Sequence, residues 1–200
     1  MRTKFIAAAL IASSALAAPA FAQDAAPFTG PRAEAIVGWD RVEDGSTANA
    51  DRADGVVYGG QIGYDFQAGS AVLGVEGEVT GSSTRQTVHN VITPGDRYRV
   101  RAGRDLYAGV RVGFTVGENA LVYAKGGYTN AGIDTSYRTP TTTFRADENV
   151  DGWRLGAGTE VKLTDKLYAK AEYRYSKYDS DSAGINAKRH QVIGGVGMRF

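Results

Sequence analysis

The sequence has 200 residues, with 23 basic and 22 acidic side chains, 26 glycines and no cysteine. The near-neutral balance gives no electrostatic footprint for nucleic acid, and the lack of cysteine excludes disulfides as a source of stability. Because glycines recur throughout the apolar segments, long helices are not expected.

The first 22 residues predict a cleaved secretory signal peptide. Arg2 and Lys4 form a positive start, residues 5–16 form an apolar run, and Ala20-Phe21-Ala22 matches the small-x-small pattern of a cleavage site. The run is too short to span a bilayer as a helix. Removing 22 of 200 residues leaves 178, the size of one domain. Residues 23–32 are expected to be an irregular lead-in to a single domain at 33–200.

Eight segments with period-2 alternation follow along the chain. Each is close to the roughly 9 to 11 residues that a tilted strand needs to cross a bilayer. They are Ala33–Val42, Val56–Phe66, Ala71–Thr80, Asp105–Val116, Ala120–Asn130, Trp153–Leu163, Lys166–Tyr178 and Gln191–Phe200.

The connections between these segments alternate strictly between short and long. The short ones are 67–70, 117–119 and 164–165, and the long ones are 43–55, 81–104, 131–152 and 179–190. Outer-membrane barrels have short periplasmic turns and longer extracellular loops, whereas a soluble sandwich has no reason to sort its loops in this way. The predicted fold is all-β, an eight-stranded antiparallel up-and-down transmembrane β-barrel at residues 33–200, with residues 23–32 in the periplasm.

The two faces of the predicted strands differ in composition. One face is apolar and aromatic, and the other combines glycines with charges of both signs. In a soluble lipocalin-like barrel the apolar face would point inward. A narrow eight-stranded interior, however, needs small residues and paired charges, while glycines on a water-facing surface would only weaken the strands. We therefore expect the apolar face to contact lipid.

This orientation predicts two sets of residues. The interior set is an ion-pair network of Glu76, Glu78, Arg111, Lys125, Arg154, Glu160, Lys170, Glu172 and Arg174. The outward set is two aromatic girdles at the headgroup levels, comprising Tyr64, Phe66 and Phe114 near the tight turns and Trp39, Tyr58, Tyr128, Trp153, Tyr173 and Tyr175 near the long connections. We expect the interior to be filled by its own side chains.

The last segment, QVIGGVGMRF, must pair with the first, because an open sheet edge in hydrocarbon leaves backbone groups unsatisfied. Its terminal Phe200 resembles the C-terminal signal read by the barrel assembly machinery. With the repeat of VYAKGGY as LYAKAEY and the segment KLYAKAEYRY, the chain resembles the small eight-stranded outer-membrane proteins of Gram-negative bacteria, of the OmpA/OmpX type and the opacity-type porin family.

The resemblance implies a protein of the cell outer membrane, exported through its signal peptide. The expected partners are outer-membrane lipids, lipopolysaccharide, and the assembly machinery and periplasmic chaperones, with the protein itself a monomer. No peptidoglycan-binding domain is expected after Phe200. The expected role is structural or surface-interacting, in envelope integrity or in adhesion through the long loops, with a small non-specific diffusion channel as the alternative.

Enzymatic chemistry is not expected. Some small outer-membrane barrels modify lipopolysaccharide with serine, histidine and acidic groups at the rim, and this chain has His89 and His190 near its long connections. His190 lies in AKRHQV without a serine two residues later, and the serines that could lie near are Ser82, Ser83, Ser180 and Ser182. No metal-ligand spacing or phosphate-binding loop is present, so no cofactor, metal or nucleic acid is expected.

Overall fold

The computed structural model describes residues 26–44, 52–89, 96–139, 142–180 and 185–200. The predicted signal peptide and the start of the lead-in lie outside these residues. Nearly all of the described chain is β-strand. No helix within it is long and apolar enough to cross a membrane.

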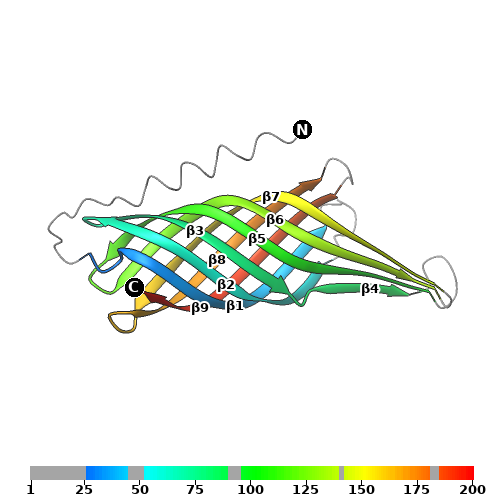
Figure 1. Ribbon diagram of the computed structural model, residues 1–200, viewed down its shortest axis with the longest axis horizontal. Coiled ribbons are helices and arrows are strands. Elements are labelled where there is room, and N and C mark those ends of the chain that lie inside the picture. Colours follow the sequence, from blue (N-terminus) through cyan, green and yellow to red (C-terminus); the bar gives the residue numbers. More distant parts are fainter. Residues whose placement is uncertain (1–25, 45–51, 90–95, 140–141, 181–184) are drawn as a thin grey trace.

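One antiparallel sheet contains all the strands (Figure 1). Its segments are β1 (Gly30–Asp44), β2 (Arg52–Ala68), β3 (Ala71–Ser82), β4 (Arg85–His89), β5 (Arg97–Val116), β6 (Ala120–Arg138), β7 (Thr143–Lys162), β8 (Leu167–Ser180) and β9 (Ile185–Arg199). Because β4 continues β3 and both pair with β5, the nine segments form eight strands.

The sheet closes on itself through β1 and β9. Trp39 pairs with Val192 in this ladder and Arg32 pairs with Arg199. The backbone N–H of Phe200 also donates to the carbonyl of Pro31 at 3.0 Å, so hydrogen bonding between the two ends of the barrel wall continues to the last residue of the chain. The predicted fold class, a closed eight-stranded antiparallel barrel whose last strand pairs with its first, is confirmed.

Three tight connections lie where the sequence placed them, at what we call the turn end of the barrel. Gly69 between β2 and β3 has φ +61°, and Gly117 between β5 and β6 has φ +66°. Glycine adopts these left-handed conformations without the steric cost that a side chain adds. The opposite end, with the longer connections, is the loop end.

The prediction of long loops at 81–104 and 131–152 was wrong for most of these residues. β5, β6 and β7 each continue as strand far beyond the predicted bounds, and β4 extends β3. The predicted strands were recognised by an apolar lipid-facing side, which ends where a strand leaves the membrane, although backbone pairing continues. Figure 1 shows the result, a sheet that extends beyond the other strands. We call it the projecting sheet, comprising β4 and residues 97–104, 131–138 and 143–150.

Apolar side chains cover the outside of the barrel. On β5, for example, Val110 is 61 % exposed and Phe114 is 60 % exposed, as the predicted orientation requires. From Leu106 to Val116 this face runs about 33 Å along the strand, or about 25 Å along the membrane normal at a tilt of about 40°, which matches the apolar band of outer-membrane barrels.

Candidate functional site

Among the described residues, the interior of the barrel contains equal numbers of buried acidic and basic side chains. The acidic side chains are Glu34, Asp40, Asp65, Glu76, Glu78, Asp105, Glu160 and Glu172. The basic ones are Arg32, Arg111, Lys125, Arg154, Lys170, Arg174, Arg189 and Arg199. A buried charge is tolerated when it is paired and hydrogen-bonded, so this balance is a condition for the barrel to fold.

At the turn end, three arginines surround two carboxylates. Asp65 pairs with Arg199 at 2.7 Å, with Arg32 at 3.2 Å, and with Arg111 through a charge-assisted hydrogen bond. Glu160 also pairs with Arg111 and accepts from Arg199 at 3.3 Å. These groups come from strands that are not all neighbours and meet inside the barrel, because Arg32 lies on β1, Asp65 on β2 and Arg111 on β5, which is separated from β2 by β3.

Two lysines occupy the middle of the interior. The ammonium group of Lys125 lies 2.6 Å from Glu76 and 3.1 Å from Glu172. Lys170 pairs with Glu34 and donates to the side-chain oxygen of Gln61 at 2.8 Å. The two lysines occupy equivalent places in the VYAKGGY and LYAKAEY repeats, so the repeat delivers two matching cations to the same layer.

Toward the loop end, guanidinium groups dominate. Glu78 pairs with Arg154 at 3.0 Å and with Arg174 at 2.6 Å. Asp105 accepts from Arg154 at 2.6 Å and from Arg189 at 2.7 Å. The pairs therefore form an unbroken network from Arg199 and Asp65, through Arg32, Glu76, Lys125, Glu172, Arg174, Glu78, Arg154 and Asp105, to Arg189 and Asp40.

All nine residues that the sequence assigned to an interior ion-pair network are buried and lie within these pairs. Two arginines of the same network, Arg32 and Arg189, were missed because they lie outside the predicted strand bounds. Both occupy in-register positions two residues from an interior side chain, Arg32 before Glu34 and Arg189 before Gln191. Extending the period by one step would have found them.

Tyrosines cover glycines inside the barrel. Tyr168 lies opposite Gly197 on β9 and its ring contacts it, and Tyr123 is related in the same way to Gly158 on β7. Tyr123 also donates a hydrogen bond to Glu172 at 2.6 Å. The interior glycines thus leave room for rings, and the rings tie into the charge network. No role for these tyrosines was predicted from the sequence.

Apolar side chains also lie inside, contrary to an interior of only glycines and charges. Ile36, Val57 and Ile193 form one buried cluster. At the turn end, Phe28 of the lead-in is fully buried with Val72, Leu121 and Tyr123. The Phe28 N–H donates to Gln67 Oε1 at 3.0 Å, so the part of the lead-in next to β1 is ordered and covers this end of the barrel.

The outward aromatics gather into contacts near the loop end. The ring centroids of Trp153 and Tyr175 lie 5.5 Å apart, and Tyr175 lies 5.1 Å from the ring of His190. The hydroxyl of Tyr173 hydrogen-bonds His190 Nδ1 at 2.7 Å, and the Arg41 guanidinium lies 4.5 Å above Trp39.

The exposed fractions of the predicted girdle residues follow one pattern. Tyr175 is half-buried. The other eight are at least 41 % exposed: Trp39, Tyr58, Tyr64, Phe66, Phe114, Tyr128, Trp153 and Tyr173.

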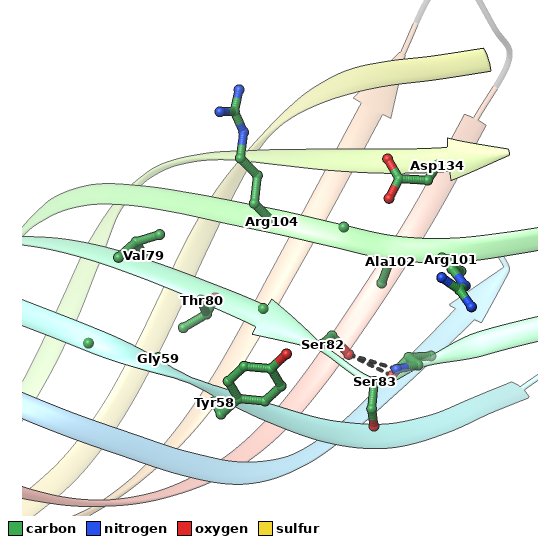
Figure 2. A pocket seen from close by; sticks show the side chains of 14 residues that line it. Tyr58, Gly59, Val79, Thr80, Ser82, Ser83, Arg101, Ala102, Arg104 and Asp134 are labelled. Carbon is green, nitrogen blue, oxygen red and sulfur yellow. Dashed lines mark hydrogen bonds between the residues drawn. The ribbon is translucent and has the colours of Figure 1, made fainter. Parts of the chain in front are cut away.

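A hollow of about 850 Å³ lies where β3 gives way to β4 (Figure 2). Its walls include Tyr58 on β2, Ser82 and Ser83 at the break, and Arg101 and Arg104 on β5. The ladder between β5 and β6 shifts register between Ala102 and Asp105, which is a β-bulge. Bulges of this kind bend a strand and interrupt its pairing, which explains an opening in the wall at this point.

The candidate catalytic residues are not brought together by the described part of the chain. His190 faces outward and bonds Tyr173. Ser82 bonds Asp40 inside the wall at 2.6 Å. The side chains of His89 and Ser180, and all of Ser182, lie outside what the structure describes. The described residues also contain no group of histidine, cysteine or acidic side chains that could hold a metal ion.

Comparison with known proteins agrees with this architecture. A family model described as "Outer membrane protein beta-barrel domain" matches residues 8–200. The 25 kDa outer-membrane immunogenic protein of Brucella abortus is 28 % identical over 176 residues, which cover 82 % of this chain and 74 % of that protein.

Two solved structures show the same fold at low sequence identity. Neisserial surface protein A superposes with a TM-score of 0.55 at 14 % identity, covering 86 % of this chain and 98 % of that one. Ail, the attachment invasion locus protein of Yersinia pestis, superposes with a TM-score of 0.53 at 17 % identity, covering 86 % and 99 %. The chain therefore belongs to the outer membrane protein beta-barrel domain family and is a protein of the cell outer membrane, as its resemblance predicted.

Proposed function

We propose that the protein is a closed outer-membrane barrel whose role is structural and surface-interacting, with the projecting sheet as the interacting part. The observation that carries the proposal is the combination of an interior occupied by paired charges with strands that continue beyond the barrel (Figure 1). The barrel anchors the sheet, and the sheet presents a large paired surface outside the membrane. Exposed segments carried on a rigid scaffold are where binding functions usually lie.

The strand ladders support a stable projection rather than separate loops. β6 and β7 remain paired from Ala131 and Val150 out to Arg138 and Thr143. β5 is paired with β6 from Arg97 onward and also carries β4. Three or more paired strands are needed for a sheet to be stable on its own account, and this projection has four.

Removal of the projecting sheet tests the proposal. Thr84 and Ala102 are joined by a 3.1 Å backbone hydrogen bond, and Ala131 pairs with Val150, so residues 85–101 and 132–149 can each be replaced by a short glycine-containing turn. We expect the shortened barrel to fold, as shown by heat-modifiable migration in gels, and the bacteria that carry it to lose adherence to cultured epithelial cells. Equal adherence with full-length and shortened protein, at equal surface amounts, would overturn the surface role.

Envelope integrity is measured separately in the same strains. Survival in bile salt or detergent reports whether the barrel alone supports the membrane. We expect the shortened barrel to restore survival to a deletion strain, because its lipid-facing strands and its interior are unchanged. If neither form changes survival, the structural part of the proposal is wrong, whatever the result for adherence.

The alternative, a small diffusion channel, is tested by conductance in planar bilayers. Eight strands enclose an interior that their own side chains fill, and Arg154, Arg174 and Glu160 are fully buried within it. We therefore expect no stepwise conductance from the refolded protein, either full-length or shortened. Regular, ohmic conductance steps from both would favour the channel.

Assembly, oligomeric state and catalysis complete the proposal. We infer a monomeric, non-enzymatic protein that reaches the membrane through periplasmic chaperones and the barrel assembly machinery, with Phe200 as part of its assembly signal. Phe200 is 68 % exposed, and its ring makes no contribution to the interior. Phe200→Ala should therefore lower the amount assembled in cells while leaving refolding in detergent nearly unchanged. Equal losses in both would indicate a role in stability only.

A further inference from the structure

We propose that the outward face of the projecting sheet carries a binding site for phosphate groups on the saccharide of the glycolipid that surrounds the barrel. The site is a hollow of about 150 Å³ formed by β5, β6 and β7. Its lining residues are Arg97, Arg99, Ser136, Arg138 and Thr143. The site is independent of the adhesive role proposed above, because its ligand belongs to the protein's own membrane.

The arginines of this hollow are placed close together against their mutual repulsion. Arg97 lies directly opposite Arg138 in the ladder between β5 and β6, and Arg99 lies opposite Ser136 one step along. Like charges directly opposite in antiparallel strands destabilise the pair. An anion bound between them would remove this repulsion, so the arrangement favours an occupied site.

The described residues give these arginines no anionic partner. Among the described residues, the lining of the hollow contains no carboxylate, and none of the ion pairs formed among their side chains involves Arg97, Arg99 or Arg138. The Nε of Arg99 is enclosed yet has no hydrogen-bond partner within that part of the chain. This contrasts with the barrel interior, where every guanidinium group is paired with a carboxylate.

The chemistry of the hollow suits a phosphate group. Guanidinium groups bind phosphate oxygens with two parallel hydrogen bonds, and the planar geometry of arginine makes this recognition specific. The hydroxyls of Ser136 and Thr143 add neutral donors at the same place. A carboxylate ligand would accept two parallel hydrogen bonds from one guanidinium group, whereas the three arginines offer more donors than a single carboxylate accepts.

The side of the sheet identifies the source of the phosphate. Tyr128 is 53 % exposed on the lipid-facing side of β6, and the pairing of β6 with β7 has no register break from there to Arg138. Side chains two residues apart share a face, so Ser136 and Arg138 continue the lipid-facing side. The hollow therefore overlooks the outer leaflet around the barrel and not the barrel mouth.

The height of the hollow favours the saccharide over the acyl end of a glycolipid. From Tyr128 to Arg138 the strand advances about 33 Å, or about 25 Å along the membrane normal at a tilt of about 40°. Nearer the membrane, the same side carries Arg104, which is exposed beside the hollow of Figure 2. Arginines therefore lie on this side of the sheet both near the headgroup level and farther from the membrane, where the saccharide of a glycolipid would extend.

The test compares the refolded full-length protein with two variants of equal charge. The first replaces all three arginines, as Arg97→Gln, Arg99→Gln and Arg138→Gln. The control, Lys162→Gln, Lys166→Gln and Lys188→Gln, removes three cations from other parts of the surface. Affinities are measured in detergent for rough lipopolysaccharide with a phosphorylated core, for the same preparation after removal of its phosphates, and for a lipid-free sulfated oligosaccharide.

We expect the wild-type protein and the control to bind the phosphorylated form about tenfold more tightly than the dephosphorylated form, as a few exposed charge pairs allow. The arginine variant should lose this preference while keeping its heat-modifiable migration. An unchanged preference in the arginine variant would overturn the site. Arginine-dependent binding of the sulfated oligosaccharide, without any preference among the lipopolysaccharides, would overturn the assignment to the membrane's own glycolipid.

Discussion

Glu172 shows how a single carboxylate inside the barrel can link side chains from several strands. It pairs with Lys125 at 3.1 Å and with Arg174, and it accepts a hydrogen bond from the hydroxyl of Tyr123 at 2.6 Å. Its partners lie on β6 and β8, and Lys125 also reaches Glu76 on β3. Such a group contributes less through the net strength of its pairs than through the cost of leaving its partners unpaired.

Replacement of Glu172 by glutamine should lower the free energy of unfolding by about 3–5 kcal/mol, because one buried positive charge is left without compensation. Adding Lys125→Met should recover part of the loss by restoring the balance of charges. Both variants are compared by urea unfolding in lipid vesicles with Glu118→Gln, at an exposed tight turn, for which we expect a change below about 0.5 kcal/mol. Additive losses from the two interior substitutions would show that Glu172 and Lys125 are not coupled.

Glycines on the two faces of the barrel differ in how much space they must leave: Gly158 lies on the interior side of β7, and Gly194 lies on the exposed, lipid-facing side of β9. A Cβ at Gly158 would lie 2.9 Å from the hydroxyl of Tyr123, whereas a Cβ at Gly194 would have nothing nearer than the carbonyl of Val37 at 3.9 Å. Gly158→Ala should therefore destabilise the barrel by about 1–3 kcal/mol through overpacking, and Gly194→Ala should be close to neutral. Urea unfolding of both variants decides this, and equal midpoints would remove the packing role of Gly158.

At the scale of the strands, the sequence predicted the part of the fold that crosses the membrane and missed the part beyond it. Alternation of Val110, Val112 and Phe114 with Arg111 and Gly113 is strong because one side meets lipid and the other meets a crowded interior. Residues 97–101, RYRVR, also alternate, but one of their faces consists of arginines and the other is not small or acidic, so the segment was not predicted as a membrane strand. Whether such a segment forms a strand is decided by its pairing partners, which lie far away in the sequence.

The candidate site divides in the same way. The interior charges could be predicted because a narrow barrel forces polar residues into a period-2 register and requires opposite signs. The arginine hollow could not, because it depends on the register that places Arg97 opposite Arg138. Nothing in the local sequence of either strand fixes that register.

The tight turns offer a test at the level of one element. Gly117 has φ +66°, and a Cβ added there would meet nothing within 4 Å, so only backbone strain opposes a side chain there. Gly117→Val should lower the free energy of unfolding by about 1–2 kcal/mol, and Gly117→Asn should cost less because asparagine tolerates the left-handed region. Folding in lipid vesicles is the measurement. Equal effects of valine and asparagine would mean that the turn relaxes to another conformation.

For the whole molecule, the usual arrangement of a water-soluble globular protein, with apolar side chains inside and charged side chains outside, is reversed. The large apolar side chains are exposed, as at Ile62 with 68 % and Val110 with 61 %, while sixteen charged side chains of the described residues are buried inside the barrel. In water this distribution would be unstable, since exposed apolar surface favours association and buried charge disfavours folding. Only a lipid solvent makes both faces favourable, and the cost of a charge on the outer face should then vary with depth.

This depth dependence can be measured on one strand. Val110 lies near the middle of the apolar face of β5, and Val116 lies at its turn end; both are exposed, at 61 % and 59 %. Val110→Arg should lower the free energy of unfolding in lipid vesicles by about 2–4 kcal/mol, and Val116→Arg by about 0–1 kcal/mol, because arginine at the midplane cannot reach the headgroups. The equal exposure of the two positions makes each the control for the other in detergent. Equal costs in vesicles would contradict a membrane centred on the middle of this strand.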